Sequence, residues 1–78
     1  MWKVYPNPAN DKITVELIDQ TEVLNTEFVI QNINGQTVLE IENLNPINRI
    51  DITDLSNGVY FLKISNSTQN QSIRLVKY

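Results

Sequence analysis

The sequence contains neither cysteine nor histidine among its 78 residues. Without cysteine the chain can form no disulfide and no thiolate metal site. Without histidine it lacks imidazole ligands and the base that most often activates a serine or cysteine nucleophile. We therefore expect no catalytic residue, no metal site and no cofactor.

Basic residues are also few: 6 lysines and arginines stand against 9 aspartates and glutamates, which gives a net charge of -3. Nucleic acids and anionic membrane surfaces attract basic faces, so neither is the expected partner. The acidic residues are scattered, and none has the Asp-x-Asp-x-Asp-Gly spacing of a calcium loop. A solvated outer surface accounts for them.

Long apolar runs are missing as well. No segment approaches the roughly 20 apolar residues that span a bilayer, and Met1-Trp2-Lys3 does not begin a signal peptide, so no membrane insertion is expected. The length allows one thin-cored domain, because so small a domain buries only about 60% of its unfolded surface. We expect residues 1–78 to form that domain, with residues 1–3 as the remnant of a linker. Trp2 either packs over an edge of the domain or marks that linker.

Alanine occurs once, while β-branched and aromatic residues fill the segments between short polar stretches. This composition favours strands separated by turns over helices. Alternation of apolar and polar residues predicts about seven short strands, at residues 3–5, 13–17, 27–31, 37–42, 49–52, 59–64 and 72–76. No helix-length segment separates them, so the expected fold is all-β, with antiparallel strands in a sandwich or barrel.

The same alternation assigns side chains to the core. Phe28 and Ile30 are expected to face it from one strand, and Tyr60, Leu62 and Ile64 from another. Tyr60 is expected to place its ring in the core and its hydroxyl on a backbone group, as buried tyrosines usually do.

The chain has 2 glycines, Gly35 and Gly58. Asn34-Gly35 stands between two apolar runs and predicts a tight hairpin in which both residues are central and have a positive φ. Gly58 precedes a predicted strand and is expected to adopt a backbone conformation that other residues resist. A phosphate-binding role is not expected, because such a site would require several glycines before a helix. Between them, Leu55 is expected to anchor a loop of turn-forming residues.

Two of the 3 prolines lie in the segment Pro6-Asn7-Pro8. Each proline fixes its own φ and pushes the residue before it into extended geometry. The segment therefore predicts a stiff corner at which the chain enters its first strands, with Asn10-Asp11 forming the turn that follows. The alternative, a ligand for a proline-reading partner, is usually longer and more open.

Several landmarks follow one another in a fixed order: Tyr5-Pro6-Asn7-Pro8 before Asn10-Asp11, Phe28-Val29-Ile30-Gln31-Asn32 before Asn34-Gly35-Gln36, Ile50-Asp51-Ile52 with Leu55, Gly58-Val59-Tyr60-Phe61-Leu62-Lys63-Ile64, and a terminal Arg74-Leu75-Val76-Lys77-Tyr78. In this order they resemble the type A C-terminal sorting domain of the type IX secretion system of Bacteroidetes. The resemblance covers nearly the whole chain and implies an immunoglobulin-like antiparallel β-sandwich of two sheets.

The resemblance further implies a non-catalytic secretion signal that acts on a covalently linked upstream cargo. Its expected partners are the type IX translocon, a shuttle and a sortase-like peptidase that removes the domain and attaches or releases the cargo. The expected route runs through the periplasm to the outer-membrane surface or the medium.

The resemblance also implies that the final residues carry much of the export signal. The expected recognition residues are Arg74, Leu75, Val76, Lys77 and Tyr78, with Lys77 at the family's basic position near the end. From the residues alone, this segment is a last strand with a frayed basic end. A free edge of such a strand can accept a strand from a partner, so the sheet face or edge near residues 73–78 is the expected point of recognition.

Two rival functions remain open at this stage. A carbohydrate-binding or adhesive module of a secreted hydrolase would need an exposed aromatic platform. The aromatic residues are Trp2, Tyr5, Phe28, Tyr60, Phe61 and Tyr78. The strand pattern assigns several of them to the core, which disfavours such a platform. A small enzyme or inhibitor is disfavoured by the size of the chain and by the missing histidine and cysteine.

Overall fold

The computed structural model describes residues 1–18, 26–42, 45–66 and 70–78. It contains the strands β1 (Trp2–Tyr5), β2 (Lys12–Leu17), β3 (Glu27–Gln31), β4 (Thr37–Glu42), β5 (Ile47–Asp51), β6 (Gly58–Ser65) and β7 (Asn70–Lys77). No helix occurs in the part of the chain that the structure describes. The predicted all-β fold with seven strands is confirmed.

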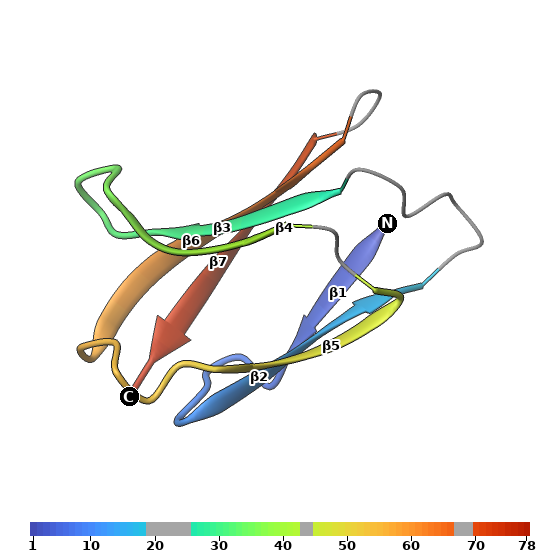
Figure 1. Cartoon of the computed structure of the whole chain (residues 1–78). Helices are drawn as coiled ribbons and strands as arrows, with labels where there is room; N and C mark the ends of the chain where they lie inside the picture. The colour runs from blue at the N-terminus through green and yellow to red at the C-terminus, as the bar shows by residue number, and fades with distance from the viewer. Residues whose placement is uncertain (19–25, 43–44, 67–69) are drawn as a thin grey trace.

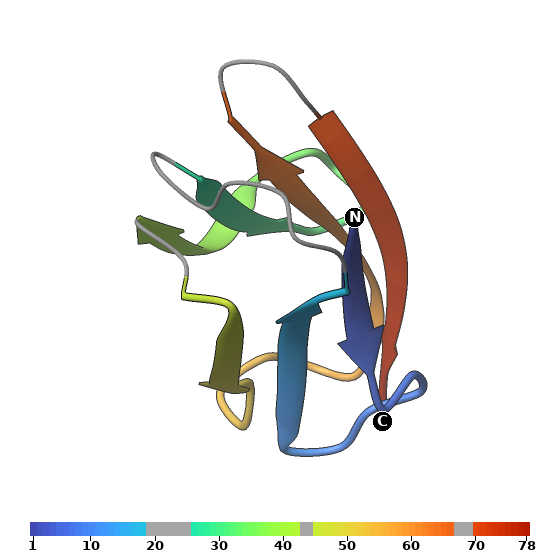
Figure 2. The same ribbon diagram turned by 90° about the vertical axis from the view of Figure 1, so that its right-hand side faces the viewer.

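The strands form two sheets, one with the order β1-β2-β5 and one with the order β4-β3-β6-β7. Every pairing of neighbouring strands is antiparallel. The two sheets lie face to face, with β1 of one sheet beside β7 of the other along one side of the sandwich (Figures 1 and 2). The first and last strands of the chain are therefore neighbours.

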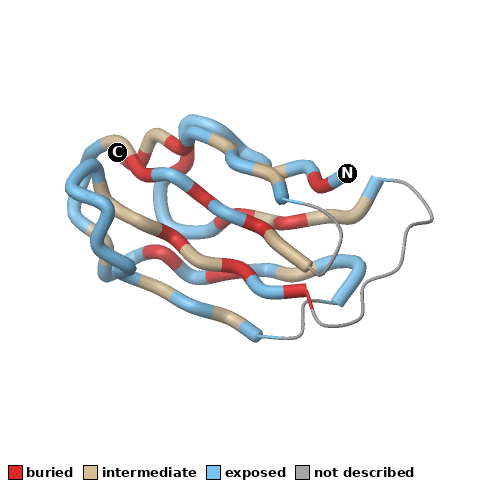
Figure 3. The backbone as a smooth tube through the Cα atoms, turned by 90° about the horizontal axis from the view of Figure 1, so that it is seen from above, coloured by how far each residue is buried: buried red, intermediate tan, exposed pale blue. Residues whose placement is uncertain are grey.

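The core fills the space between the sheets. Buried and outward residues alternate along the strands, as Figure 3 shows. Phe28 and Ile30 of β3 are fully buried and pair in register with Ile64 and Leu62 of β6. Tyr60 of β6 is buried as well, which confirms the predicted core faces. Burial of one such large apolar side chain stabilises the fold by about 1.5–3 kcal/mol.

The first strand begins one residue earlier than predicted, at Trp2. Trp2 and Lys3 therefore lie within the sheet, and the Trp2 side chain is only 7% exposed. The Gln71 side chain accepts a hydrogen bond from the Trp2 N–H and donates one to the Trp2 carbonyl, both at 2.8 Å. These bonds attach β1 to the beginning of β7.

The hairpin between β3 and β4 is present, but its turn differs from the predicted one. The N–H of Gly35 donates to the carbonyl of Asn32 at 3.0 Å, so Ile33 and Asn34 are the central residues. Gly35 follows them with a φ of +81°, the left-handed position of a three-residue hairpin loop. The Asn32 side chain stabilises this longer loop because its Oδ1 accepts bonds from the N–H groups of Asn34 and Gln36.

The structure also bears on two other predicted loops. Between the strands predicted at residues 59–64 and 72–76, β6 extends one residue further, to Ser65, and β7 begins two residues earlier, at Asn70. Residues 67–69 lie outside the described part of the chain. The predicted anchor Leu55 is half-buried against the core, and its N–H donates to the Ile52 carbonyl at 3.0 Å.

Candidate functional site

The predicted corner and the predicted recognition segment meet in space. The side-chain amide of Asn7 donates to the carbonyl of Arg74 at 2.7 Å and accepts from the N–H of Val76 at 3.1 Å. The connection from β1 to β2 accordingly lies beside the end of β7 (Figure 2). An asparagine side chain carries both a donor and an acceptor, so it can form the two bonds that a neighbouring strand would form.

Ala9 continues this contact with its main chain. Its N–H donates to the Val76 carbonyl at 2.8 Å, and its carbonyl accepts from the N–H of Tyr78 at 2.9 Å. The resulting bridge between Ala9 and Lys77 is parallel, and the Ala9 side chain is fully buried. The chain therefore leaves the sheet of β1, turns at the prolines and pairs with the edge of the other sheet, which agrees with the predicted corner.

The expectation of a free, frayed terminal strand is wrong. The outward main-chain groups of β7 from the Arg74 carbonyl to the Tyr78 N–H are paired by Asn7 and Ala9. The physical reason is that the chain's own corner supplies the hydrogen-bonding groups that an edge strand otherwise lacks. This part of the edge cannot accept a partner strand unless the corner leaves it.

The five predicted recognition residues divide between two faces. Arg74 and Tyr78 are exposed, Tyr78 by 61%, and Val76 is half-buried. Leu75 and Lys77 are buried, Lys77 with only 7% of its surface exposed. The Lys77 Nζ donates to the Tyr78 carbonyl at 3.4 Å. Lys77 thus packs inside the end of the sandwich instead of extending from a frayed end.

The outward residues of β6 and β7 form the surface next to this segment. Phe61 lies directly across from Arg74, and Val59 lies across from Val76. Because positions two apart on a strand share a face, these four side chains lie together on the outside of the sheet. Phe61 is exposed, and the two valines are half-buried. We refer to Val59, Phe61, Arg74 and Val76 as the β6–β7 patch.

The remaining predicted motif residues shape the turn that enters β6. Gly58 has a φ of +151°, a conformation that residues with a side chain rarely adopt. The ring of Tyr60 is in the core, and its hydroxyl donates to the Ser56 carbonyl at 2.6 Å. Gly58 also pairs in register with Lys77, so this turn supports the end of β7.

The opposite outer face, on the sheet of β1, carries a separate polar cluster. The Tyr5 hydroxyl donates to Glu16 Oε1 at 2.7 Å, and the Lys3 ammonium lies 5.2 Å from the centre of the Tyr5 ring. The hydrogen bond to Glu16 is the main cause of the raised pKa of Tyr5. A surface cation and an aromatic ring at this distance attract each other, and this attraction modestly stabilises the positions of the Lys3 and Tyr5 side chains.

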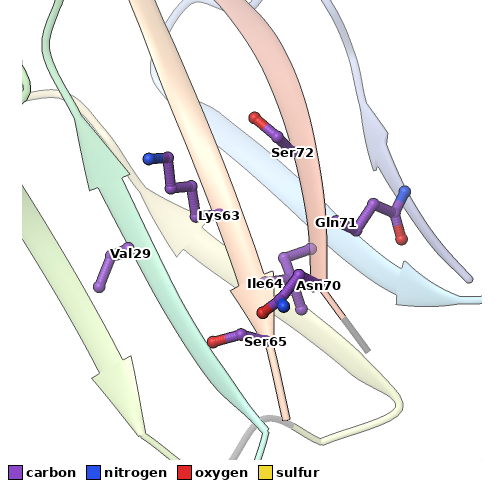
Figure 4. Close-up of a pocket in the computed structure, with 7 residues that line it drawn as sticks. All are labelled: Val29, Lys63, Ile64, Ser65, Asn70, Gln71 and Ser72. Carbon is purple, nitrogen blue, oxygen red and sulfur yellow. The ribbon is translucent and has the colours of Figure 1, made fainter. Parts of the chain in front are cut away.

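A shallow depression of about 440 Å³ lies at the other end of the β6–β7 hairpin (Figure 4). Its lining includes Val29, Lys63, Ser65, Asn70 and Ser72. Lys63 contributes a cation and the others contribute hydroxyl, amide and apolar groups, with no carboxylate, histidine or cysteine in the lining.

Metal ligands are not grouped in the described residues either: no set of three or more acidic, histidine or cysteine side chains is close enough to hold an ion. The described segments also contain no apolar helix of membrane-spanning length.

A model of the family described as the secretion system C-terminal sorting domain matches residues 3–78. The chain belongs to this family. The sorting domains of this family are signals of the type IX secretion system, so membership implies export by that system and partners within its machinery. The family is generally non-catalytic.

A comparison of structures supports the fold. PorZ, an essential bacterial surface component of the type IX secretion system of Porphyromonas gingivalis, contains a region similar to this sorting domain, with a TM-score of 0.74 and 18% sequence identity. The similarity covers 99% of this chain and 11% of PorZ, so the chain corresponds to a small part of that protein. At this identity the similarity concerns the fold alone. No curated protein matches the chain.

Proposed function

We propose that residues 1–78 form one non-catalytic sorting domain that directs a covalently linked upstream cargo through the type IX outer-membrane translocon. The cargo passes through the periplasm and reaches the outer-membrane surface or the medium. A shuttle and a sortase-like peptidase act on the complex, and the peptidase removes the domain and attaches or releases the cargo. The recognised segment is Arg74 to Tyr78.

The observation that supports this segment is the β6–β7 patch beside an exposed Tyr78. Phe61 and Arg74 are exposed cross-strand neighbours. A planar guanidinium next to apolar and aromatic groups suits a protein partner, because aromatic residues and arginine are enriched at binding hot spots. The machinery therefore reads outward side chains of β7, since the main-chain edge beside them is paired.

The rival function, a carbohydrate-binding module, lacks support in the positions of the aromatic rings. Three rings are exposed, but Tyr5 lies on the outer face opposite to Phe61, and Tyr78 lies four positions along the chain from Arg74, the cross-strand partner of Phe61. Trp2, Phe28 and Tyr60 are buried. Within the described residues these rings form no common platform for a sugar.

The experiment is an export assay in a type IX-competent bacterium, with residues 1–78 fused to a fluorescent reporter that carries a signal peptide. Arg74→Ala is expected to reduce surface and medium fluorescence several-fold and to leave the reporter in the periplasm. Lys63→Ala is the matched control, because Lys63 is another exposed cation on the outer face of β6. Normal export by Arg74→Ala and by a fusion that ends at Ile73 would contradict the proposed segment.

A further inference from the structure

We infer that Asn7 is a positioning residue for the export signal, so that the signal is a composite of the two ends of the domain and is complete only when Asn7 holds the last strand. The inference rests on the proposed function of Arg74 to Tyr78. Asn7 lies between two prolines at the beginning of the chain, 67 positions before Arg74.

The geometry of Asn7 is that of a strand partner. Its Nδ2 donates to the carbonyl of Arg74 at 2.7 Å, and its Oδ1 accepts from the N–H of Val76 at 3.1 Å. An antiparallel or parallel neighbour would bond to these same two groups, which point away from β6. Ala9 then takes the next two outward groups, the Val76 carbonyl and the Tyr78 N–H. The side chain of Asn7 thus begins a ladder that the main chain of Ala9 completes.

Few other side chains could replace this one. Asp has the same shape but only accepts hydrogen bonds when ionised, so it would face the Arg74 carbonyl with a second oxygen. Ala removes both bonds. In Asn7→Ala the Arg74 carbonyl and the Val76 N–H both lose their partner. In Asn7→Asp the Val76 N–H keeps an acceptor, but the Arg74 carbonyl loses its donor and faces a carboxylate oxygen.

The consequence reaches the residues that the machinery is proposed to read. Chain ends fray unless they are tied down. Asn7 ties down the main chain at Arg74 and Val76, whose side chains form half of the β6–β7 patch. Both flanking residues of Asn7 are prolines, which fix their own φ and restrict the conformations of the corner. The beginning of the domain therefore sets the conformation of its end.

The test uses the reporter fusion in a type IX-competent bacterium with Asn7→Ala and Asn7→Asp. Both variants are expected to reduce export at least about fivefold with residues 74–78 unchanged. Asn10→Ala is the matched control, because Asn10 is an exposed asparagine of the same connection with no side-chain bond in the described structure. Hydrogen exchange on the 78-residue chain checks the mechanism: exchange of the Val76 N–H is expected to accelerate about tenfold in Asn7→Ala, while that of Leu62 in β6 is unchanged.

A core variant separates positioning from stability. Ile30→Val shortens a fully buried side chain of β3 and destabilises the fold while leaving the Asn7 contact intact. Lost export in the Asn7 variants with normal export in Ile30→Val supports the inference. Normal export in either Asn7 variant, or equal loss in Ile30→Val, overturns it. If a fusion that ends at Ile73 is exported normally, the proposed recognition segment itself fails, which is a separate result.

Discussion

The two glycines give the sharpest prediction about stability, because they have positive φ angles of different kinds. Gly35 has a φ of +81° and Gly58 a φ of +151°. A β-carbon added at either position would have no heavy atom within 4 Å. Any cost of substitution therefore comes from the backbone conformation and not from a clash.

The expected loss in the free energy of unfolding differs between Gly35 and Gly58. Asparagine visits the left-handed region of Gly35 readily, so Gly35→Asn is expected to cost well under about 1 kcal/mol and Gly35→Ala about 1 kcal/mol. The φ of Gly58 lies in a region that is essentially restricted to glycine, so Gly58→Ala and Gly58→Asn are both expected to cost about 1–3 kcal/mol. A domain of 78 residues has a total stability of about 4–12 kcal/mol.

Urea unfolding of the four variants, followed by circular dichroism, measures these costs. With a slope of about 1–2 kcal/mol/M, a loss of 2 kcal/mol lowers the midpoint by about 1–2 M. If Gly58→Asn is as mild as Gly35→Asn, or if Gly58→Ala matches the unmodified chain within about 0.5 kcal/mol, the conformational reasoning is refuted.

Three further predictions concern the core and the pH dependence. Tyr60→Phe removes the hydrogen bond to the Ser56 carbonyl and is expected to lower the free energy of unfolding by about 0.5–1.5 kcal/mol, which urea titration measures; no change would refute a stabilising bond. Phe28→Ala opens a cavity in a fully buried site and is expected to cost about 3–5 kcal/mol, so thermal melting should show a strongly lowered or absent transition; a loss below about 1 kcal/mol would contradict the assigned core. Hydrogen bonds from Thr53 lower the pKa of Asp51, so this contribution to stability is present above the unfolded-state pKa of about 3.9 and is lost as the pH falls through the lower folded-state pKa. Unfolding experiments between about pH 2 and pH 5 should show a smaller loss on acidification for Asp51→Asn, and an identical loss in both proteins would refute the assignment.

Much of the fold could be predicted from local patterns. The alternation in β6 predicts its two faces because the side-chain period of a strand is two residues, and the structure has Leu62 buried and Lys63 exposed. The Asn34-Gly35 pair predicted the hairpin but not its turn, because the choice of turn depends on the side chain of Asn32, which bonds two N–H groups of the loop. The Asn34-Gly35 pair alone contains no information about these hydrogen bonds of Asn32.

The candidate site was less predictable because it joins distant parts of the chain. The bonds of Asn7 span 67 and 69 positions, and no periodicity links residues so far apart. The burial of Lys77 could have been inferred, since it lies two positions after the buried Leu75 on the same strand face. The charge of Lys77 favoured the prediction that its side chain is exposed. In the structure, position 77 of β7 faces the core, so the side chain is buried.

The most direct test of the central claim is whether residues 1–78 alone direct a reporter out of the cell. A signal-peptide reporter fused to these residues is expressed in a type IX-competent strain and in the same strain without the translocon. The account predicts reporter at the surface or in the medium of the competent strain and retention in the periplasm of the other. Periplasmic retention in the competent strain, or equal export in both strains, would contradict it.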